Sequence, residues 1–118
     1  MTKITKEMVQ QAYLTARRVW EEQESRYAAS MEIHRLTGMG TGSAGDYITV
    51  FLAMMEGKVY KRTVNLYATE FFLVKIGEDY GIEAQQRAAQ AVKAHVAYYR
   101  QVHGYLAKTD QLADRFLN

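Results

Sequence analysis

The sequence predicts an all-α fold, a compact bundle of five to six helices that forms a single helical domain over residues 1–118. The chain contains no proline, the residue that most often interrupts a helix. Residues with high helix propensity, such as Ala, Glu, Gln, Arg, Met and Leu, are abundant. Apolar residues recur every three or four positions, and no segment shows the strict alternation of apolar and polar residues that is typical of strands.

The first helix is expected over residues 6–22, with Thr5 as its N-cap. No strong breaker follows it, so the first two helices are either continuous or jointed, and Ser25 as a second cap favours the joint. The second helix is then expected over residues 26–37, ended by Gly38 in a left-handed conformation. Its predicted buried residues are Ala29, Ile33 and Leu36.

A run of small residues at 38–45 is expected to form a loop. Within it, Ser43 and, three positions later, Asp46 match a capping box, with Asp in the place usually taken by Glu. The third helix is therefore expected over residues 44–56, and Gly57 ends it. The glycines of the loop also match the pattern G-x-G-x-x-G, which follows a strand in dinucleotide-binding units. No strand is expected here, so they are interpreted as a helix stop, a turn and a cap.

Three more helices are expected in the second half of the chain. Thr63 is the predicted cap of a fourth helix over residues 64–80. The fifth helix is the longest, over residues 82–103. Either Gly104 or a turn at residues 108–110 interrupts it, and a short last helix is expected over residues 111–117.

The predicted second and third helices resemble a helix-turn-helix in outline, around residues 26–56. A DNA-binding motif of this kind lays its second helix in the major groove. The predicted turn is longer than the usual three or four residues. The outer face of the third helix also has no Arg, Lys, Asn or Gln to read base edges, so an ordinary helical hairpin is favoured. That predicted outer face comprises Asp46, Thr49, Val50, Ala53 and Glu56.

The most basic stretch of the chain joins the third and fourth helices at residues 58–62. Basic side chains beside an aromatic ring can hold a phosphate backbone or stack a nucleic-acid base. The alternative is a solvated loop beside a buried tyrosine. The Ser43 hydroxyl at a helix start adds a place for one phosphate oxygen, although the nearby Asp46 opposes a strong anion site. The predicted nucleic-acid contacts are Lys58, Tyr60, Lys61, Arg62, Ser43 and Thr63.

The residues that carry common catalytic chemistry are absent or wrongly spaced. Without cysteine, the chain has no thiolate chemistry and no cysteine zinc site. His95, Tyr99 and His103 share one face of the fifth helix, but the two imidazoles are about 12 Å apart along its axis. A half-buried histidine near the aromatic core is therefore favoured over a metal ligand. No nucleophile elbow, Walker loop or paired-acid motif occurs, so we expect no catalytic residue, no metal and no cofactor.

Composition sets the expected compartment and limits the partners. A net charge of +2 is too small to identify a nucleic-acid partner by itself. No apolar run approaches the roughly 18 residues of a membrane helix, and no signal peptide opens the chain. We therefore expect a cytoplasmic protein without a membrane partner.

A series of short motifs runs in order from about Thr37 to Tyr99. The motifs include Ser43-Ala44-Gly45-Asp46-Tyr47-Ile48, Met54-Met55-Glu56-Gly57-Lys58, Tyr60-Lys61-Arg62-Thr63, Tyr67-Ala68-Thr69, Glu78-Asp79-Tyr80-Gly81 and His95-Val96-Ala97-Tyr98-Tyr99. Together they resemble the helical module that precedes the nuclease part of many bacterial HNH endonucleases of the modified-cytosine restriction type.

The chain also departs from that family. Ile82 stands where members often have proline after Asp-Tyr-Gly. The His-Asn-His nuclease core is absent, and nothing after Tyr99 could build a ββα-metal site. The resemblance therefore implies DNA recognition or protein docking, either as a standalone protein or as the accessory part of a nuclease, and not cleavage by this chain.

Our leading hypothesis is a non-enzymatic helical accessory domain in a restriction or anti-phage defence setting. Its expected partner is duplex DNA, a nuclease or another protein. The alternative is a protein-interaction module, either a homo-oligomer or an inhibitor of a host nuclease encoded by a phage or mobile element. An exposed patch of aromatic and Met residues on the fourth and fifth predicted helices would favour that alternative.

Overall fold

The computed structural model describes residues 3–117, and within that range the chain forms six α-helices and no strand. The prediction of an all-α fold is confirmed. In chain order the helices are α1 (Lys6–Trp20), α2 (Arg26–Thr37), α3 (Thr41–Glu56), α4 (Leu66–Tyr80), α5 (Ile82–Val102) and α6 (Ala107–Asp114).

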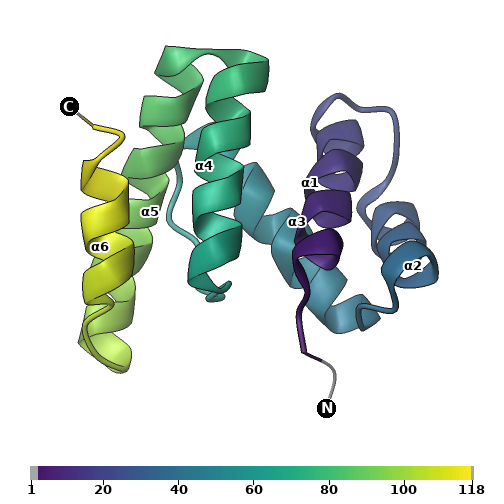
Figure 1. Cartoon of the computed structure of the whole chain (residues 1–118), viewed down its shortest axis with the longest axis horizontal. Coiled ribbons are helices and arrows are strands. Elements are labelled where there is room, and N and C mark those ends of the chain that lie inside the picture. Colours follow the sequence, from purple (N-terminus) through teal and green to yellow (C-terminus); the bar gives the residue numbers. More distant parts are fainter. Residues whose placement is uncertain (1–2, 118) are drawn as a thin grey trace. The chain divides into compact units, whose positions relative to one another are not determined.

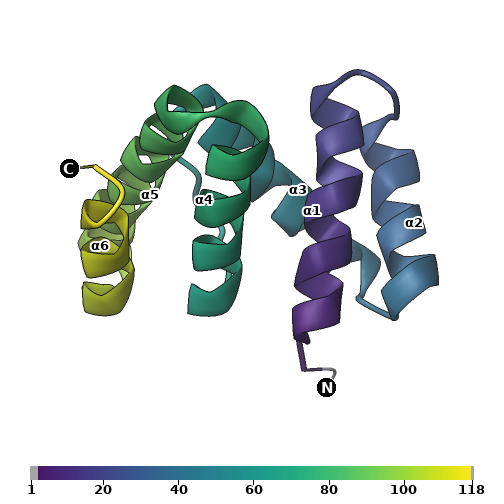
Figure 2. The ribbon, with the colours of Figure 1, turned by 45° about the horizontal axis from the view of Figure 1, so that its top comes forward.

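The chain divides into two compact units, at residues 1–52 and 53–118, and the boundary lies within α3. In the first unit α1 and α2 lie side by side (Figures 1 and 2). In the second unit α5 packs against both α4 and α6, and α6 also contacts α4 (Figure 1). The single domain expected over residues 1–118 stays a prediction.

Two predicted caps set the start of α1 and α2. The Thr5 hydroxyl accepts a hydrogen bond from the Met8 backbone N–H at 3.1 Å, and the Ser25 hydroxyl accepts one from the Ala28 N–H at 3.1 Å. Between the helices, Glu22 adopts a left-handed backbone conformation with φ of 60°. The first two helices are therefore jointed, as Ser25 indicated.

The first unit is held by a small apolar core and one arginine. Tyr13 of α1 is fully buried and meets Phe51 of α3 edge to face, with ring centroids 5.3 Å apart. Arg18 binds the carboxylates of both Glu24 and Glu32, which joins α1 to α2. The prediction that Leu36 is buried is wrong, because its side chain is 45% exposed.

The third helix begins at Thr41, three residues earlier than predicted. The Ala44 N–H donates to the Gly40 carbonyl at 2.9 Å, so Ser43 lies inside the first turn and the predicted capping box is wrong. The preceding turn is short because Met39 is fully buried and its carbonyl accepts from His34 Nδ1 at 2.8 Å. Only three residues, 38–40, separate α2 from α3.

The fourth and sixth helices also begin elsewhere than predicted. Asn65 caps α4, since its side-chain oxygen accepts from the Ala68 N–H at 2.7 Å, and Thr63 is not the cap. Of the two predicted interruptions after α5, the one at Gly104 is confirmed, since α5 ends at Val102 and Gly104 has φ of 154°, whereas residues 108–110 belong to α6. The early start of α6 places Asp110 and Asp114 one turn apart, where both bind Lys93 of α5, at 2.6 and 2.7 Å.

Gly81 makes the sharp turn between α4 and α5. Its φ of 97° and ψ of 174° lie in a region that is nearly restricted to glycine. We predict that Gly81→Ala lowers the free energy of unfolding by about 1–3 kcal/mol, measured by urea denaturation. Gly45 in α3 has open space where a Cβ would lie, and its φ is not positive. Gly45→Ala is the matched control and should raise the free energy of unfolding by about 0.5–1 kcal/mol. Equal effects of the two variants would contradict the requirement for glycine at position 81.

Candidate nucleic-acid interface

The predicted basic stretch is the connector between α3 and α4, which we define as residues 57–65. Gly57 ends α3 with φ of 71°, and its N–H donates to the Met54 carbonyl at 3.3 Å. The Lys58 N–H donates to the Ala53 carbonyl at 2.9 Å, which completes a Schellman motif. This cap fixes the direction in which the connector leaves the helix.

The net charge of the chain is concentrated at the start of this connector. Residues 56–62 contain three basic side chains and one acidic side chain, and the remainder of the sequence contains 12 of each. The whole excess of +2 therefore belongs to a seven-residue segment. A local excess of this kind attracts an anionic partner more effectively than the same charge spread over the surface.

The three cations of the connector, Lys58, Lys61 and Arg62, are all exposed. Lys58 forms an ion pair with Glu56 at 3.3 Å, and both side chains are exposed, so solvent weakens the pair. Lys61 Nζ lies 5.6 Å from the centre of the Tyr98 ring, within the range of a cation–π contact. The structure thus presents these three predicted residues to solvent.

Tyr60 does not face solvent, and its predicted role as a base-stacking platform is wrong. Its side chain is only 3% exposed, and its ring stacks on the imidazole of His95 with centroids 4.3 Å apart and planes 13° apart. Burial raises the pKa of the Tyr60 hydroxyl well above its usual range. With one ring face occupied by His95 and the rest covered, Tyr60 has no surface for a base. The alternative interpretation, a solvated loop beside a buried tyrosine, describes the structure.

His95 of α5 anchors the connector through both of its ring nitrogens. Nδ1 lies 2.6 Å from the Tyr60 carbonyl oxygen, and Nε2 lies 3.1 Å from Thr63 Oγ1. Because a carbonyl can only accept, Nδ1 carries the proton, and in the neutral ring Nε2 accepts from the Thr63 hydroxyl. Burial lowers the pKa of His95, and the hydrogen bond to the Tyr60 carbonyl opposes that shift. Thr63 is therefore occupied within the protein, and the predicted half-buried His95 is in fact only 1% exposed.

Arg87 of α5 is a residue near the connector that sequence reasoning missed. Its Nε donates to the Met55 carbonyl at 3.3 Å, and its side chain packs against Gly57, where an added Cβ would lie 2.7 Å from Arg87 Cγ. It is exposed and adds a fourth cation beside the start of the connector. Only its charge marks it in the sequence, since the contact joins residues far apart in the chain.

Ser43, the remaining predicted contact, belongs to the first unit and lies exposed in the first turn of α3. The turn before α3 has the length of a helix-turn-helix turn, which corrects the prediction of a longer loop. The helix itself is nevertheless unsuited to a groove. Val50, predicted on the outer face, is fully buried, and Thr49 is hydrogen-bonded by Arg26 of α2. The buried residues of α3 are Ala44, Tyr47, Ile48, Val50, Phe51, Met54 and Met55.

The described part of the chain contains no group of three His, Asp or Glu side chains placed to share a metal ion. Both nitrogens of His95 are already bonded to protein atoms, while His103 lies exposed next to Tyr99, with ring centroids 4.7 Å apart. None of the helices in residues 3–117 is long and apolar enough to cross a membrane.

Comparisons with protein-family models, with curated proteins and with solved structures give no significant match for this chain. The resemblance to the accessory module of HNH endonucleases therefore stays a prediction.

Because His95 anchors the connector, its protonation makes the free energy of unfolding depend on pH. Below about pH 6.5, the unfolded chain binds a proton at residue 95 that the folded chain resists, because burial lowers the pKa of the folded group. We predict that the free energy of unfolding falls as the pH decreases from 7.5 to 5.5, and that His95→Gln reduces this fall. His103→Gln, at an exposed histidine, is the control and should keep it. Equal pH dependence of the wild type and His95→Gln in urea denaturation would show that residue 95 is not the cause.

Proposed function

We propose that the protein is a non-enzymatic helical accessory domain that binds the phosphate backbone of duplex DNA through Lys58, Lys61 and Arg62 of the connector. The single observation that carries the proposal is the concentration of the net positive charge in this exposed segment. The bacterial restriction or anti-phage defence setting is part of the proposal and rests on the resemblance of residues 37–99 to the accessory module of HNH endonucleases.

Anchoring of the connector supports this function. The Schellman motif at Gly57 and the two hydrogen bonds of His95 restrain the backbone on both sides of Lys61. Cations on a restrained backbone lose less conformational entropy when they meet a phosphate than cations on a mobile loop. The short segment therefore presents its charged residues from a restrained backbone.

The arrangement favours contact with phosphates over reading of bases. Sequence is read by hydrogen bonds and apolar contacts with base edges, whereas phosphate contacts are independent of sequence. Tyr60, the one aromatic residue within the connector, faces inward. Lys58 and Lys61 bear point charges that suit phosphate oxygens. We therefore propose backbone binding without recognition of a particular base or of a modified cytosine.

A protein-interaction module is the second candidate function, and one observation favours it. Tyr27 and Met31 of α2 are 76% and 42% exposed and border a groove of about 540 Å³ in the first unit. Exposed aromatic and Met side chains are typical of protein interfaces. The exposed large apolar residues of α4 and α5 are Leu66, Val74, Ile82 and Val102, so the patch of aromatic and Met residues that would favour this alternative does not lie on those two helices.

Salt dependence tests the leading function. Three cations on B-DNA predict that the logarithm of the association constant falls with the logarithm of salt concentration with a slope of about −2.7. Lys61→Ala/Arg62→Ala should reduce the magnitude of that slope by about 1.8, measured by fluorescence anisotropy on a 20-base-pair duplex. The control Arg35→Ala/Lys75→Ala removes the same charge from helical positions outside the connector and should leave the slope unchanged. No binding at low salt would contradict the function, and an unchanged slope in the first variant would contradict the residue assignment.

A second measurement tests what the connector reads. We predict dissociation constants that agree within about a factor of two for unmodified, methylated and hydroxymethylated duplexes, because phosphate contacts carry no base information. Competition anisotropy with the three duplexes measures this at one salt concentration. A tenfold preference for any of them would reveal a base contact and would contradict binding through the phosphate backbone alone.

A further inference from the structure

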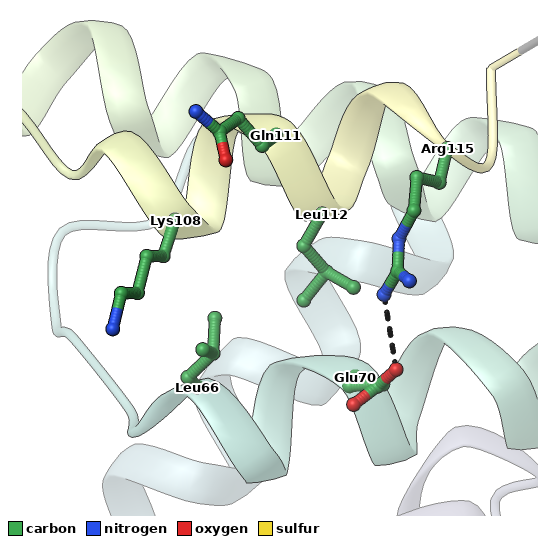
Figure 3. A pocket seen from close by; sticks show the side chains of 6 residues that line it. All are labelled: Leu66, Glu70, Lys108, Gln111, Leu112 and Arg115. Atoms are coloured by element: carbon green, nitrogen blue, oxygen red, sulfur yellow. Dashed lines mark hydrogen bonds and ion pairs between the residues drawn. The ribbon is translucent and has the colours of Figure 1, made fainter.

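A slot with a volume of about 270 Å³ lies between α4 and α6 in the second unit. Figure 3 shows Leu66 and Leu112 pointing toward each other across it, with Lys108 at one end and Arg115 paired with Glu70 at the other. Leu66 is 41% exposed and Leu112 is 5% exposed, so the slot has an apolar floor that solvent reaches.

Each end of the slot has a cation, but only one of the two cations is paired with an acid. At one end, Arg115 Nη2 donates to Glu70 Oε2 across the slot at 3.0 Å. At the other end Lys108 faces Leu66, which cannot accept a hydrogen bond. Within residues 3–117, the Lys108 ammonium makes no hydrogen bond or ion pair, and neither does the Gln111 side chain at the rim. The slot therefore lacks an acid opposite one of its two cations.

We propose that the slot is a docking site for a partner protein, through a segment in which an Asp or Glu side chain stands beside a large apolar side chain. The carboxylate accepts from Lys108 and supplies the missing acid, and the apolar side chain covers Leu66 and Leu112. Gln111 lies where its amide can bond the backbone of such a segment. This site does not rest on DNA binding by the connector.

The charge and the floor of the slot together favour this occupant over a nucleic acid. Arg115 neutralises Glu70 at the far end, so Lys108 carries the one uncompensated charge among the lining residues. A single carboxylate matches that charge, whereas Leu66 and Leu112 between the two ends offer no cation to the successive phosphates of a polyanion. The apolar floor also contributes to binding only when the partner brings apolar surface to bury.

Selection from a phage-displayed library of random 12-residue peptides on the full chain tests the proposal. We expect the recovered peptides to carry Asp or Glu within a few positions of Leu, Ile or Phe. Their affinity, measured by anisotropy, should fall at least tenfold for Lys108→Glu and at least threefold for the milder Lys108→Gln. Lys75→Glu, on α4 but outside the slot, is the control and should bind as the wild type does.

Three results would overturn the proposal. The first is a selection in which no peptide depends on Lys108 while circular dichroism shows that both Lys108 variants are folded. The second is a homo-oligomer in light scattering that Lys108→Glu dissociates, since the occupant is then a second copy of the chain. The third is duplex DNA binding that Lys108→Glu abolishes and Lys61→Ala/Arg62→Ala does not affect, which would make the slot a phosphate site.

Discussion

The buried imidazole of His95 is the contact on which the conformation of the connector depends. Its two nitrogens bond the Tyr60 carbonyl and the Thr63 hydroxyl, and its face covers the Tyr60 ring. A buried polar group that loses its partner costs about 1–3 kcal/mol, so displacement of the connector would leave the imidazole unpaired or admit water. With Tyr60 held inward, Lys61 and the neighbouring cations are left on the outside. The same histidine therefore determines which connector side chains a partner can reach.

The sequence predicts a helix end correctly where residues close in sequence set it. It fails where a contact with a distant residue decides the end. Thr5, Ser25 and Gly38 act through backbone groups within a few residues, so their pattern is visible in the sequence. Thr63 and Asn65 are both good caps by residue type, and the bond from Thr63 to His95 leaves the cap of α4 to Asn65. That choice depends on a residue 32 positions away, and sequence spacing carries no sign of it.

The sequence predicts the basic residues of the candidate site, but not the orientation of Tyr60 or the position of Arg87. Runs of Lys and Arg are visible in composition, so Lys58, Lys61 and Arg62 were found correctly as exposed residues of a connector. The direction of Tyr60 was not, because a tyrosine in a basic loop has the same sequence pattern whether its ring faces solvent or core. Arg87 was missed for the related reason that its contact with Gly57 joins α5 to a connector distant in sequence. The error changes the proposed chemistry, since a connector without an exposed ring cannot stack bases and leaves phosphate contacts as the proposed mode of binding.

Pairing separates the cations that hold the fold from those that remain available to a partner. Arg18 binds two carboxylates and joins α1 to α2, and Lys93 binds two carboxylates and joins α5 to α6. A neighbouring carboxylate cancels much of the field of a cation, and the geometry of the pair fixes the side chain. Lys61 and Lys108 have no carboxylate partner among the described residues, and both are exposed. Lys61 lies over an aromatic ring in a basic segment, whereas Lys108 lies over an apolar floor with an acid beyond it. We therefore propose a different anion for each lysine from its surroundings, a phosphate of a polyanion for Lys61 and a single carboxylate on an apolar segment for Lys108.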